Sequence, residues 1–379
     1  MKRVVIFVAV LMVGMFGCSK QEQQGDLYTI KIDHDAMFEG DIYDISHIFT
    51  DDIDVIPLQT LDNVLLEENA DYKICDGDIF IASGFNNGEL YRFGTDGKLK
   101  NSISRTGRGP GELISVIHWE VIEDSVLFFQ NIDSKYLIYS LDGSGFREIM
   151  PDENYPNIER LWYNDGILNI ITYQELYKLM QYDVKTGVVE KYMKCDTSEF
   201  ENSWDKISNY SCVHNNILHF LCWANDTIYA FDGEKVQPRF CFDFAKKVPL
   251  SKMKSDISVF FRYVTEVNVV WHAELDALTD KYLFIKYHYG APAYVAIHNM
   301  DSGETFAASV YMSDGLPVYD FRIVGDKCYF MVGVSELMEL IPEILENPSV
   351  NDKVKEKLKA LYSQIGEDDN PVIFVKRFK

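Results

Sequence analysis

The chain has 379 residues and a formal net charge of −23 at pH 7. Its length allows one large domain or two ordinary ones. The acidity is spread along the chain, which makes nucleic acid an unsuitable partner and disfavours an anionic membrane surface, because both need a basic protein surface. Aromatic residues make up 14% of the chain, a composition that favours strands over helices.

The N-terminus has the features of a lipoprotein signal peptide over residues 1–17. Two basic residues precede an apolar run of 13 residues, 4–16, which is short of the ~20 needed to span a bilayer. A small residue and Cys18 follow directly, an arrangement that resembles a bacterial lipoprotein cleavage site with Cys18 as the lipidated residue. The alternative is an ordinary secreted protein with an incidental cysteine. Residues 18–50 are then predicted to be a polar tether and an N-terminal segment.

Residues 53–59 have the pattern of a strand, with Pro57 near its end. Proline lacks a backbone N–H, so this strand should lie at a sheet edge or end at Pro57. If the repeats that follow close into a ring, one blade is expected to combine strands from both ends of the chain. This segment is the candidate for the N-terminal strand of that blade.

The stretch from Asp76 to Glu112 sets the repeat of the chain. It reads as four short strands, and its apolar runs lie at 78–83, 90–93 and 99–104. Asn-Gly and Asp-Gly turns separate the runs, and a glycine-rich segment ends the unit. This pattern is typical of an antiparallel meander. Comparable units start at residues 123, 164, 214, 279 and 325. A period of about 45 residues with four strands per unit predicts propeller blades.

The last unit is interrupted by residues 335–366, where apolar residues recur at helical spacing, and a strand restarts at Val372. The sequence therefore predicts an all-β fold, a six-bladed β-propeller over residues 51–379 with a short helical insertion (335–366) in the last blade. An irregular β-sandwich is the alternative; it is disfavoured because a sandwich does not repeat an Asp-Gly turn at one place in every unit.

The segments 56–60, 91–97 and 107–112, together with the ending Asp369-Asn370-Pro371, resemble the six-bladed β-propeller lipoproteins of Gram-negative envelopes, which are similar to NHL-repeat proteins. The resemblance covers nearly the whole mature chain and implies a fold and a location in the cell envelope, on the periplasmic face or the cell surface. It implies no activity, and no catalytic residue can be transferred from it. Some NHL-like propellers are lyases or lactonases with a metal in the central channel.

Tryptophan recurs about once per unit from the second unit onward, and such a ring around a propeller mouth could stack on sugars or peptide side chains. The alternative is packing between blades, since buried aromatics dominate β cores. The candidates are Trp119, Trp162, Trp223 and Trp271. Arg105 and Arg108 flank the glycine-rich segment and could hold an anionic ligand group, or could pair with carboxylates such as Glu112.

His118, His272 and His288 are the weak candidates for a metal site in the channel, and no catalytic residue or cofactor is predicted. The six cysteines after Cys18 lack metal-binding spacing and are expected mostly as buried thiols, with one disulfide possible. The leading hypothesis is a non-catalytic, envelope-anchored module that binds an unknown glycan, peptide or envelope protein. The alternative is a metal-dependent hydrolase or lyase that works in the propeller channel.

Overall fold

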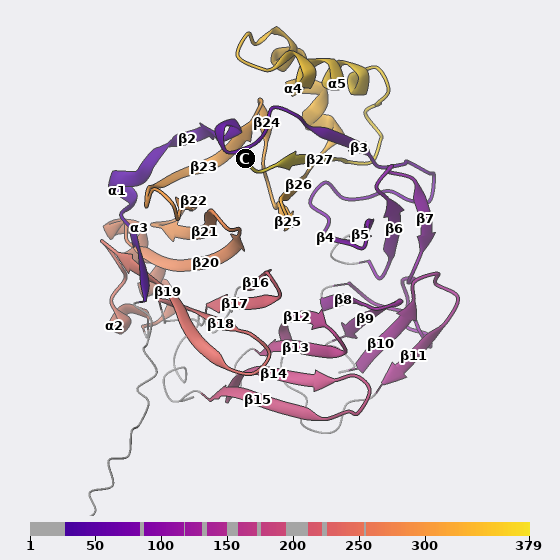
Figure 1. Ribbon diagram of the computed structural model, residues 1–379, viewed down its shortest axis with the longest axis horizontal. Coiled ribbons are helices and arrows are strands. Elements are labelled where there is room, and N and C mark those ends of the chain that lie inside the picture. Colours follow the sequence, from indigo (N-terminus) through magenta and orange to yellow (C-terminus); the bar gives the residue numbers. More distant parts are fainter. Residues whose placement is uncertain are drawn as a thin grey trace, which may run out of the picture.

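The computed structural model describes residues 27–83, 87–116, 118–130, 135–149, 158–172, 176–194, 211–221, 226–253 and 255–379. Six small sheets are arranged in a ring around a central axis, so the chain is a six-bladed β-propeller, as predicted (Figure 1). In every blade the strands of the repeating unit succeed each other outward from the axis, and the strands that residues 27–57 add to three blades lie at the outer edge.

The first three blades are antiparallel meanders of four strands each. Blade 1 contains β4 (Tyr72–Cys75), β5 (Asp78–Ala82), β6 (Leu90–Gly94) and β7 (Leu99–Ser102). Blade 2 contains β8 (His118–Ile122), β9 (Ser125–Gln130), β10 (Lys135–Ser140) and β11 (Phe146–Ile149). Blade 3 contains β12 (Ile158–Asn164), β13 (Ile167–Thr172), β14 (Tyr177–Asp183) and β15 (Val189–Lys194).

The other three blades take up strands from the N-terminal segment. Blade 4 contains β16 (Ser211–His214), β17 (Ile217–Leu221), β18 (Thr227–Phe231), β19 (Val236–Phe244) and β1 (Tyr28–Ile32). Blade 5 contains β20 (Val270–Leu278), β21 (Tyr282–Tyr289), β22 (Ala293–Asn299), β23 (Thr305–Ser313), β24 (Leu316–Pro317) and β2 (Phe38–Asp44). Blade 6 contains β25 (Arg322–Val324), β26 (Lys327–Val332), β27 (Val372–Arg377) and β3 (Asp54–Pro57).

The ring closes in blade 6, where strands from the two ends of the chain pair. β3 lies antiparallel to β27, with Ile56 opposite Ile373 and Pro57 opposite Val372. β3 is the outer edge strand and ends at Pro57, so both the predicted closure and the predicted effect of the proline are confirmed.

The repeated Asp-Gly turn, such as Asp96-Gly97, joins the third strand of a blade to the fourth, but the boundary predicted for the repeating unit is shifted by one strand. The stretch 76–112 begins at the turn between β4 and β5 and holds the three strands β5 to β7, and the first strand of the blade, β4, precedes it. Asp76 and Gly77 at this turn have φ of 49° and 79°, and Asp165 and Gly166 repeat the pattern with 46° and 84°. Two successive residues with positive φ are the requirement of a type I′ hairpin turn, which Asp-Gly satisfies.

Apolar clusters lie between neighbouring blades. Phe80 and Leu90 of blade 1 pack against Val126 and Phe128 of blade 2, and similar clusters occupy the other five interfaces of the ring. Each sheet therefore buries both faces against its neighbours, which is why a single meander of this sequence would not be stable alone.

The helical insertion contains α4 (Val334–Glu346) and α5 (Asp352–Tyr362), at the top of Figure 1. Leu337 and Ile341 of α4, with Leu358 of α5, are buried in the cluster that also contains Phe330 and Phe374 of blade 6. The apolar spacing that predicted the helices thus marks the face that packs on the propeller.

Residues 27–50 are more structured than a tether. β1 pairs in parallel with β19, and β2 pairs in parallel with β23, so both extend blades at their outer edges. Between and after them lie α1 (His34–Met37) and a short 3₁₀ helix (Ser46–Ile48). The link from blade 4 to blade 5 carries α2 (Leu250–Met253) and α3 (Ile257–Val267). Among the described residues, no helix is long and apolar enough to cross a membrane.

Candidate functional site

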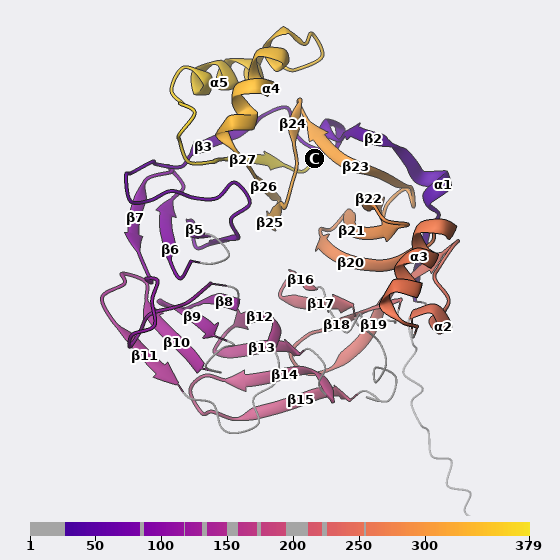
Figure 2. The same cartoon turned by 180° about the vertical axis from the view of Figure 1, so that it is seen from behind.

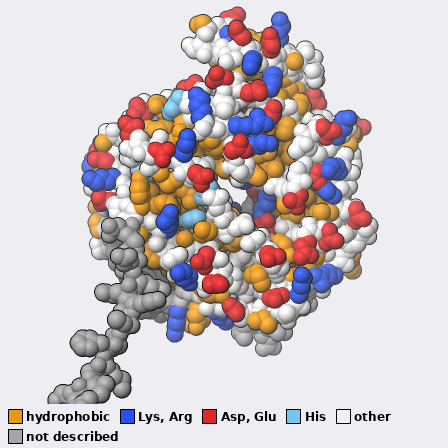
Figure 3. Space-filling view, in the orientation of Figure 1, with side chains coloured by type: hydrophobic (Ala, Val, Ile, Leu, Met, Phe, Trp, Pro, Cys, Tyr) orange, Lys and Arg blue, Asp and Glu red, His pale blue; other side chains and the backbone are white. Residues whose placement is uncertain are grey.

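A central channel with a volume of about 920 Å³ runs through the ring. The innermost strands of all six blades line it, and the space-filling view shows an opening at the centre of the disc with charged side chains around it (Figure 3). Because these strands border the channel, they carry charged residues such as Lys73 and Glu120, whereas the middle strands of a blade, such as β5 and β9, are almost wholly buried. This explains why the sequence pattern did not reveal them as strands.

Ion pairs connect the blades along one arc of the channel wall. The Lys73 ammonium lies 2.7 Å from a Glu120 carboxylate oxygen, and it also donates to the Trp119 carbonyl at 2.7 Å. The Trp119 indole N–H donates to Asp71 at 2.9 Å, and Arg322 pairs with the same carboxylate at 2.9 Å. Blades 1, 2 and 6 are thereby joined through one carboxylate and one lysine.

The arc continues on blade 5. The Lys286 ammonium lies 3.3 Å from Asp276 and 3.2 Å from Asp320. Burial raises the pKa of the Asp276 carboxyl, although Lys286 opposes this shift. Burial likewise raises the pKa of Glu120 against the attraction of Lys73. These carboxyl groups are therefore held by the fold in surroundings that weaken their ionised form.

The channel lining is acidic overall. Its charged side chains comprise eight carboxylates and four Lys or Arg: Asp71, Asp76, Glu120, Glu123, Asp165, Glu274, Asp276 and Asp320 against Lys73, Arg160, Lys286 and Arg322. A ligand group that enters the channel would therefore meet a negative field, which favours neutral or cationic groups over anions.

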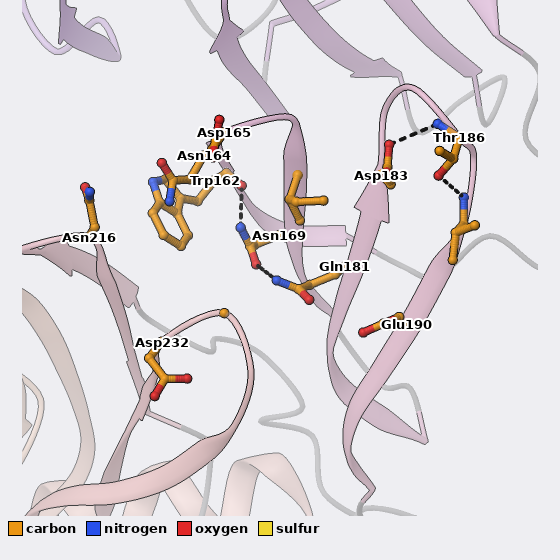
Figure 4. Close-up of a pocket in the computed structure, with 13 residues that line it drawn as sticks. Trp162, Asn164, Asp165, Asn169, Gln181, Asp183, Thr186, Glu190, Asn216 and Asp232 are labelled. Atoms are coloured by element: carbon orange, nitrogen blue, oxygen red, sulfur yellow. Dashed lines mark hydrogen bonds between the residues drawn. The ribbon is translucent and has the colours of Figure 1, made fainter.

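A second cavity, here called the blade 3–4 cleft, has a volume of about 420 Å³ and opens between blades 3 and 4 (Figure 4). It shares Trp162, Asn164, Asp165 and Asn216 with the channel lining, so the two cavities adjoin. Its walls come from the turns that join first to second and third to fourth strands in both blades.

Amide side chains form one wall of the cleft. The Asn169 amide donates to the Trp162 carbonyl at 3.4 Å, and the Gln181 amide donates to Asn169 at 3.1 Å. The Tyr192 hydroxyl lies 2.8 Å from the Gln181 carbonyl oxygen and 2.6 Å from a Glu190 carboxylate oxygen, and its one proton serves either acceptor. This chain of hydrogen bonds, visible in part in Figure 4, fixes which atoms of the amides remain available to a ligand.

The carboxylates of the cleft are held in place by turns. Asp183 accepts from the backbone N–H groups of Lys185 and Thr186, and these bonds lower the pKa of its carboxyl. Asp232 of blade 4 accepts in the same way from the backbone N–H groups that follow it, with the same effect on its pKa. Both groups are therefore ionised at neutral pH and rigidly placed.

The tryptophan candidates separate into different environments. Trp119 is only 2% exposed and belongs to the core between blades 1 and 2, so it cannot be a stacking platform and that expectation is corrected. Trp271 is half-buried against α3, with its indole N–H bonded to the Gly290 carbonyl at 2.7 Å. Trp162 is also half-buried, and it lines both the cleft and the channel. Trp223 lies outside the described residues.

The two arginine candidates are exposed on the link between β7 and β8. In that link a Glu112 carboxylate oxygen accepts from the Gly109 N–H at 2.7 Å, and a Cβ on Gly107 would lie 1.9 Å from the same oxygen. The glycine-rich segment thus folds around Glu112, as an inter-blade link would. Neither Arg105 nor Arg108 lines a cavity described here.

The three histidine candidates do not converge. His272 and His288 face each other across β20 and β21, with ring centroids 5.8 Å apart, and His272 lies 2.9 Å from Glu274. His118 lies in blade 2, where burial lowers its pKa to about 4. Within the described ranges, no group of three or more His, Cys, Asp or Glu residues could hold a metal ion.

The cysteines that the structure describes are free thiols: Cys75, Cys212, Cys241 and Cys328. Burial raises the pKa of the Cys75 thiol to about 11, so this thiol is unreactive at neutral pH. Cys18, Cys195 and Cys222 lie outside the described residues.

Sequence reasoning missed the polar residues of the cleft. Asn169 is buried in the run Ile167–Thr172, where an amide among apolar residues was a usable signal. Asp183 and Asp232 gave no signal, because an Asp at a hairpin turn is ordinary and only the fold brings two such turns to one cavity.

A family model described as a domain of unknown function (DUF4934) matches residues 27–377. The chain belongs to the DUF4934 family. No curated protein matches it. This DUF4934 protein is similar to the crystal structure of a candidate exported protein from Bacteroides fragilis, with a TM-score of 0.70 and 16% identity over 93% of this chain and 99% of that one.

A second similar structure is a DUF4221 family member from Bacteroides vulgatus, with a TM-score of 0.51 and 14% identity over 86% of this chain and 96% of that one. At these identities the likeness establishes the shared propeller fold. The kinship with NHL-repeat proteins stays a prediction.

Proposed function

We propose that this DUF4934 protein is an exported, lipid-anchored module of the cell envelope that binds a glycan in the blade 3–4 cleft and performs no chemistry on it. Export is supported by the signal-like residues 1–17 and by the similarity to a candidate exported protein. Attachment is assigned to Cys18, which follows the apolar run directly.

The half-buried indole of Trp162, which packs against the core between blades 3 and 4 and also lines the cleft, carries the proposal. Amide and carboxylate oxygens surround it, from Asn164, Asp165, Asn169 and Gln181 of blade 3 and from blade 4. A flat aromatic surface stacks on the apolar face of a sugar ring, while amides and carboxylates accept and donate hydrogen bonds to its hydroxyl groups. Both requirements of sugar recognition meet in one cavity.

The charges of the cleft narrow the class of glycan. Its described lining contains four carboxylates, Asp165, Asp183, Glu190 and Asp232, and neither Lys nor Arg. Uronic acids and sulfated sugars would be repelled by these groups. We therefore assign neutral or amino sugars as the ligand class.

The test is a titration of the purified chain with neutral, amino and anionic oligosaccharides, followed by calorimetry. We expect measurable binding for a neutral or amino sugar, and Trp162→Ala should weaken it about tenfold or more because aromatic contacts contribute ~1 kcal/mol beyond their buried area. Trp271→Phe, which alters a tryptophan in another blade, is the matched control and should bind as the parent does.

Two results would contradict the proposal: no member of the neutral and amino sugar set binds, or binding survives Trp162→Ala unchanged. Attachment is tested separately. Mass spectrometry of the membrane fraction should show acyl chains on Cys18, and Cys18→Ser should release the protein.

A further inference from the structure

The helix α3 carries exposed apolar side chains in addition to those that pack against the propeller. Phe260 and Val264 are buried against Val269 and the half-buried Trp271. Yet four further residues of this 11-residue helix are large, apolar and 43–50% exposed: Ile257, Val259, Phe261 and Val267.

These residues form two ridges on either side of the buried one. Ile257 and Phe261 are four positions apart and lie on one flank, with Phe261 in edge contact with Trp271 at 5.9 Å. Val259 and Val267 are eight positions apart on the other flank, with Tyr263 between them. The apolar arc of the helix is therefore wider than the contact with blade 5 requires.

The charge around α3 is opposite to that of the chain. Residues 246–267, which end with α3, include five Lys or Arg and two acidic residues, Asp256 and Glu266, whereas the whole chain has a net charge of −23. Lys246 and Lys247 pair with Asp35 and Asp226. The Lys252 ammonium lies 5.1 Å from the centre of the Tyr263 ring. Arg262 is exposed on α3 itself.

The position of α3 relates it to the N-terminal attachment. β1 pairs with β19, and the residue after β19, Ala245, donates its N–H to Ile32 at 3.1 Å. β19 leads directly into α2 and α3, which lie at the same edge of the disc (Figure 2). Cys18 is ten residues before Tyr28, so an extended chain could span at most about 35 Å between them.

We propose that the exposed flanks of α3 contact the surface of the bilayer that holds the lipid anchor. The inference rests on the proposed attachment at Cys18. Apolar side chains beside Lys and Arg suit the headgroup boundary, where phosphates accept from the cations and acyl chains cover the apolar residues. The acidity of the rest of the chain does not prevent this, because charges beyond about 8 Å are screened at physiological ionic strength.

The test measures vesicle binding without the covalent anchor. The chain carrying Cys18→Ser is sedimented with vesicles of phosphatidylethanolamine and phosphatidylglycerol, and with vesicles of phosphatidylcholine alone. We expect binding to the first and weaker binding to the second. Ile257→Ser with Phe261→Ser, and separately Val259→Ser with Val267→Ser, should each lower the partition coefficient about tenfold, as expected when apolar contact drives interfacial binding.

Val188→Ser with Val189→Ser is the matched control for vesicle binding, because both valines are as exposed but lie where the turn of the cleft enters β15, away from α3. This pair should bind vesicles as the parent does. The second α3 pair keeps the inference testable if loss of the Phe261–Trp271 contact impairs folding. Failure of the parent to bind, or an equal loss in the control pair, would overturn the inference.

The remaining outcomes separate this inference from the other proposals. If both α3 pairs leave vesicle binding intact, the apolar surface serves a protein partner instead and the inference is wrong. Oligosaccharide titration reports on the cleft and acylation reports on Cys18, so each can fail independently of vesicle binding.

Discussion

The side chain of Asn370 ties the closing strand to the link that enters blade 1. Asn370 is 3% exposed and stands two residues before β27. Its oxygen accepts from the Leu66 N–H at 2.8 Å, and its amide donates to the carbonyls of Gln59 at 3.0 Å and Val64 at 2.8 Å. Three side-chain hydrogen bonds thus join segments that are about 300 residues apart in sequence.

We expect Asn370→Ala to lower the free energy of unfolding by about 3–5 kcal/mol, since each bond contributes ~1 kcal/mol net and three buried backbone groups lose their partners. Asn351→Ala is the matched control. Asn351 caps α5 through one hydrogen bond to the Lys353 N–H at 2.9 Å, and its loss should cost ~1 kcal/mol.

Urea unfolding of both variants, followed by circular dichroism and tryptophan fluorescence, gives the two differences. If Asn370→Ala costs no more than Asn351→Ala, the three bonds do not stabilise closure of the ring and the reasoning is refuted.

Two further predictions concern the closure and the pH dependence. Gly97 and Gly187 occupy corresponding turns with φ of +77° and +73°, but a Cβ on Gly97 would lie 2.0 Å from the Pro57 carbonyl in β3, whereas a Cβ on Gly187 meets nothing within 4 Å. Gly187→Ala should lower the free energy of unfolding by ~1–2 kcal/mol through backbone strain alone. Gly97→Ala should lower it by about 1–3 kcal/mol more, because the added Cβ meets β3. Equal losses in urea unfolding would show that the contact between Gly97 and β3 tolerates the extra atom. Burial lowers the pKa of His118 to about 4 from an ordinary 6.5, so between these pH values the unfolded chain binds a proton that the folded chain does not. The free energy of unfolding should therefore decrease as the pH falls from 6.5 to 4. His118→Gln should make this decrease smaller. A decrease of the same size in the variant would contradict the lowered pKa of His118.

The blades and the closure could be read from local sequence because they depend on local chemistry. Asp76-Gly77 and Asp165-Gly166 have the positive φ values that a two-residue hairpin turn requires, and Pro57 limits its strand to an edge because it lacks a backbone N–H. The helices α4 and α5 followed from apolar spacing for the same reason.

The innermost strands were missed because they face the channel. β4 has the sequence YKIC, and Lys73 in it points its ammonium to Glu120 rather than to a core. A strand of four residues with a charged side chain in it is too short and too polar to stand out as an apolar run. The pattern of residues 28–32 allowed a strand there, and β1 has these bounds, but the parallel pairing of β1 and β2 was missed for a different reason: their partners, β19 and β23, lie more than 200 residues away.

The tryptophans show where recurrence in sequence fails as a guide to a site. Trp119 and Trp162 both lie on innermost strands, β8 and β12. Both pack against a core between blades, but Trp119 is fully buried while Trp162 is half-buried and also lines the cleft. The neighbouring blade accounts for the difference: Phe80 and Leu90 of blade 1 belong to the cluster that buries Trp119, whereas turns of blade 4 form the cleft wall across from Trp162. The position of a tryptophan within its own repeat therefore does not determine how deeply it is buried.

The topology places the two proposed contacts on opposite faces of the disc. In an antiparallel four-stranded blade, the turns after the first and third strands lie on one face, and the loops after the second and fourth strands lie on the other. The cleft is built from the first kind of turn, at Asp165, Asp183 and Asp232, whereas α2 and α3 belong to the link after the fourth strand of blade 4. A chain that rests α3 on the bilayer would therefore turn the Trp162 cleft away from it, toward ligands in solution. A glycan receptor on an anchor of about ten residues needs that orientation, because the opposite one would close the cleft against the membrane.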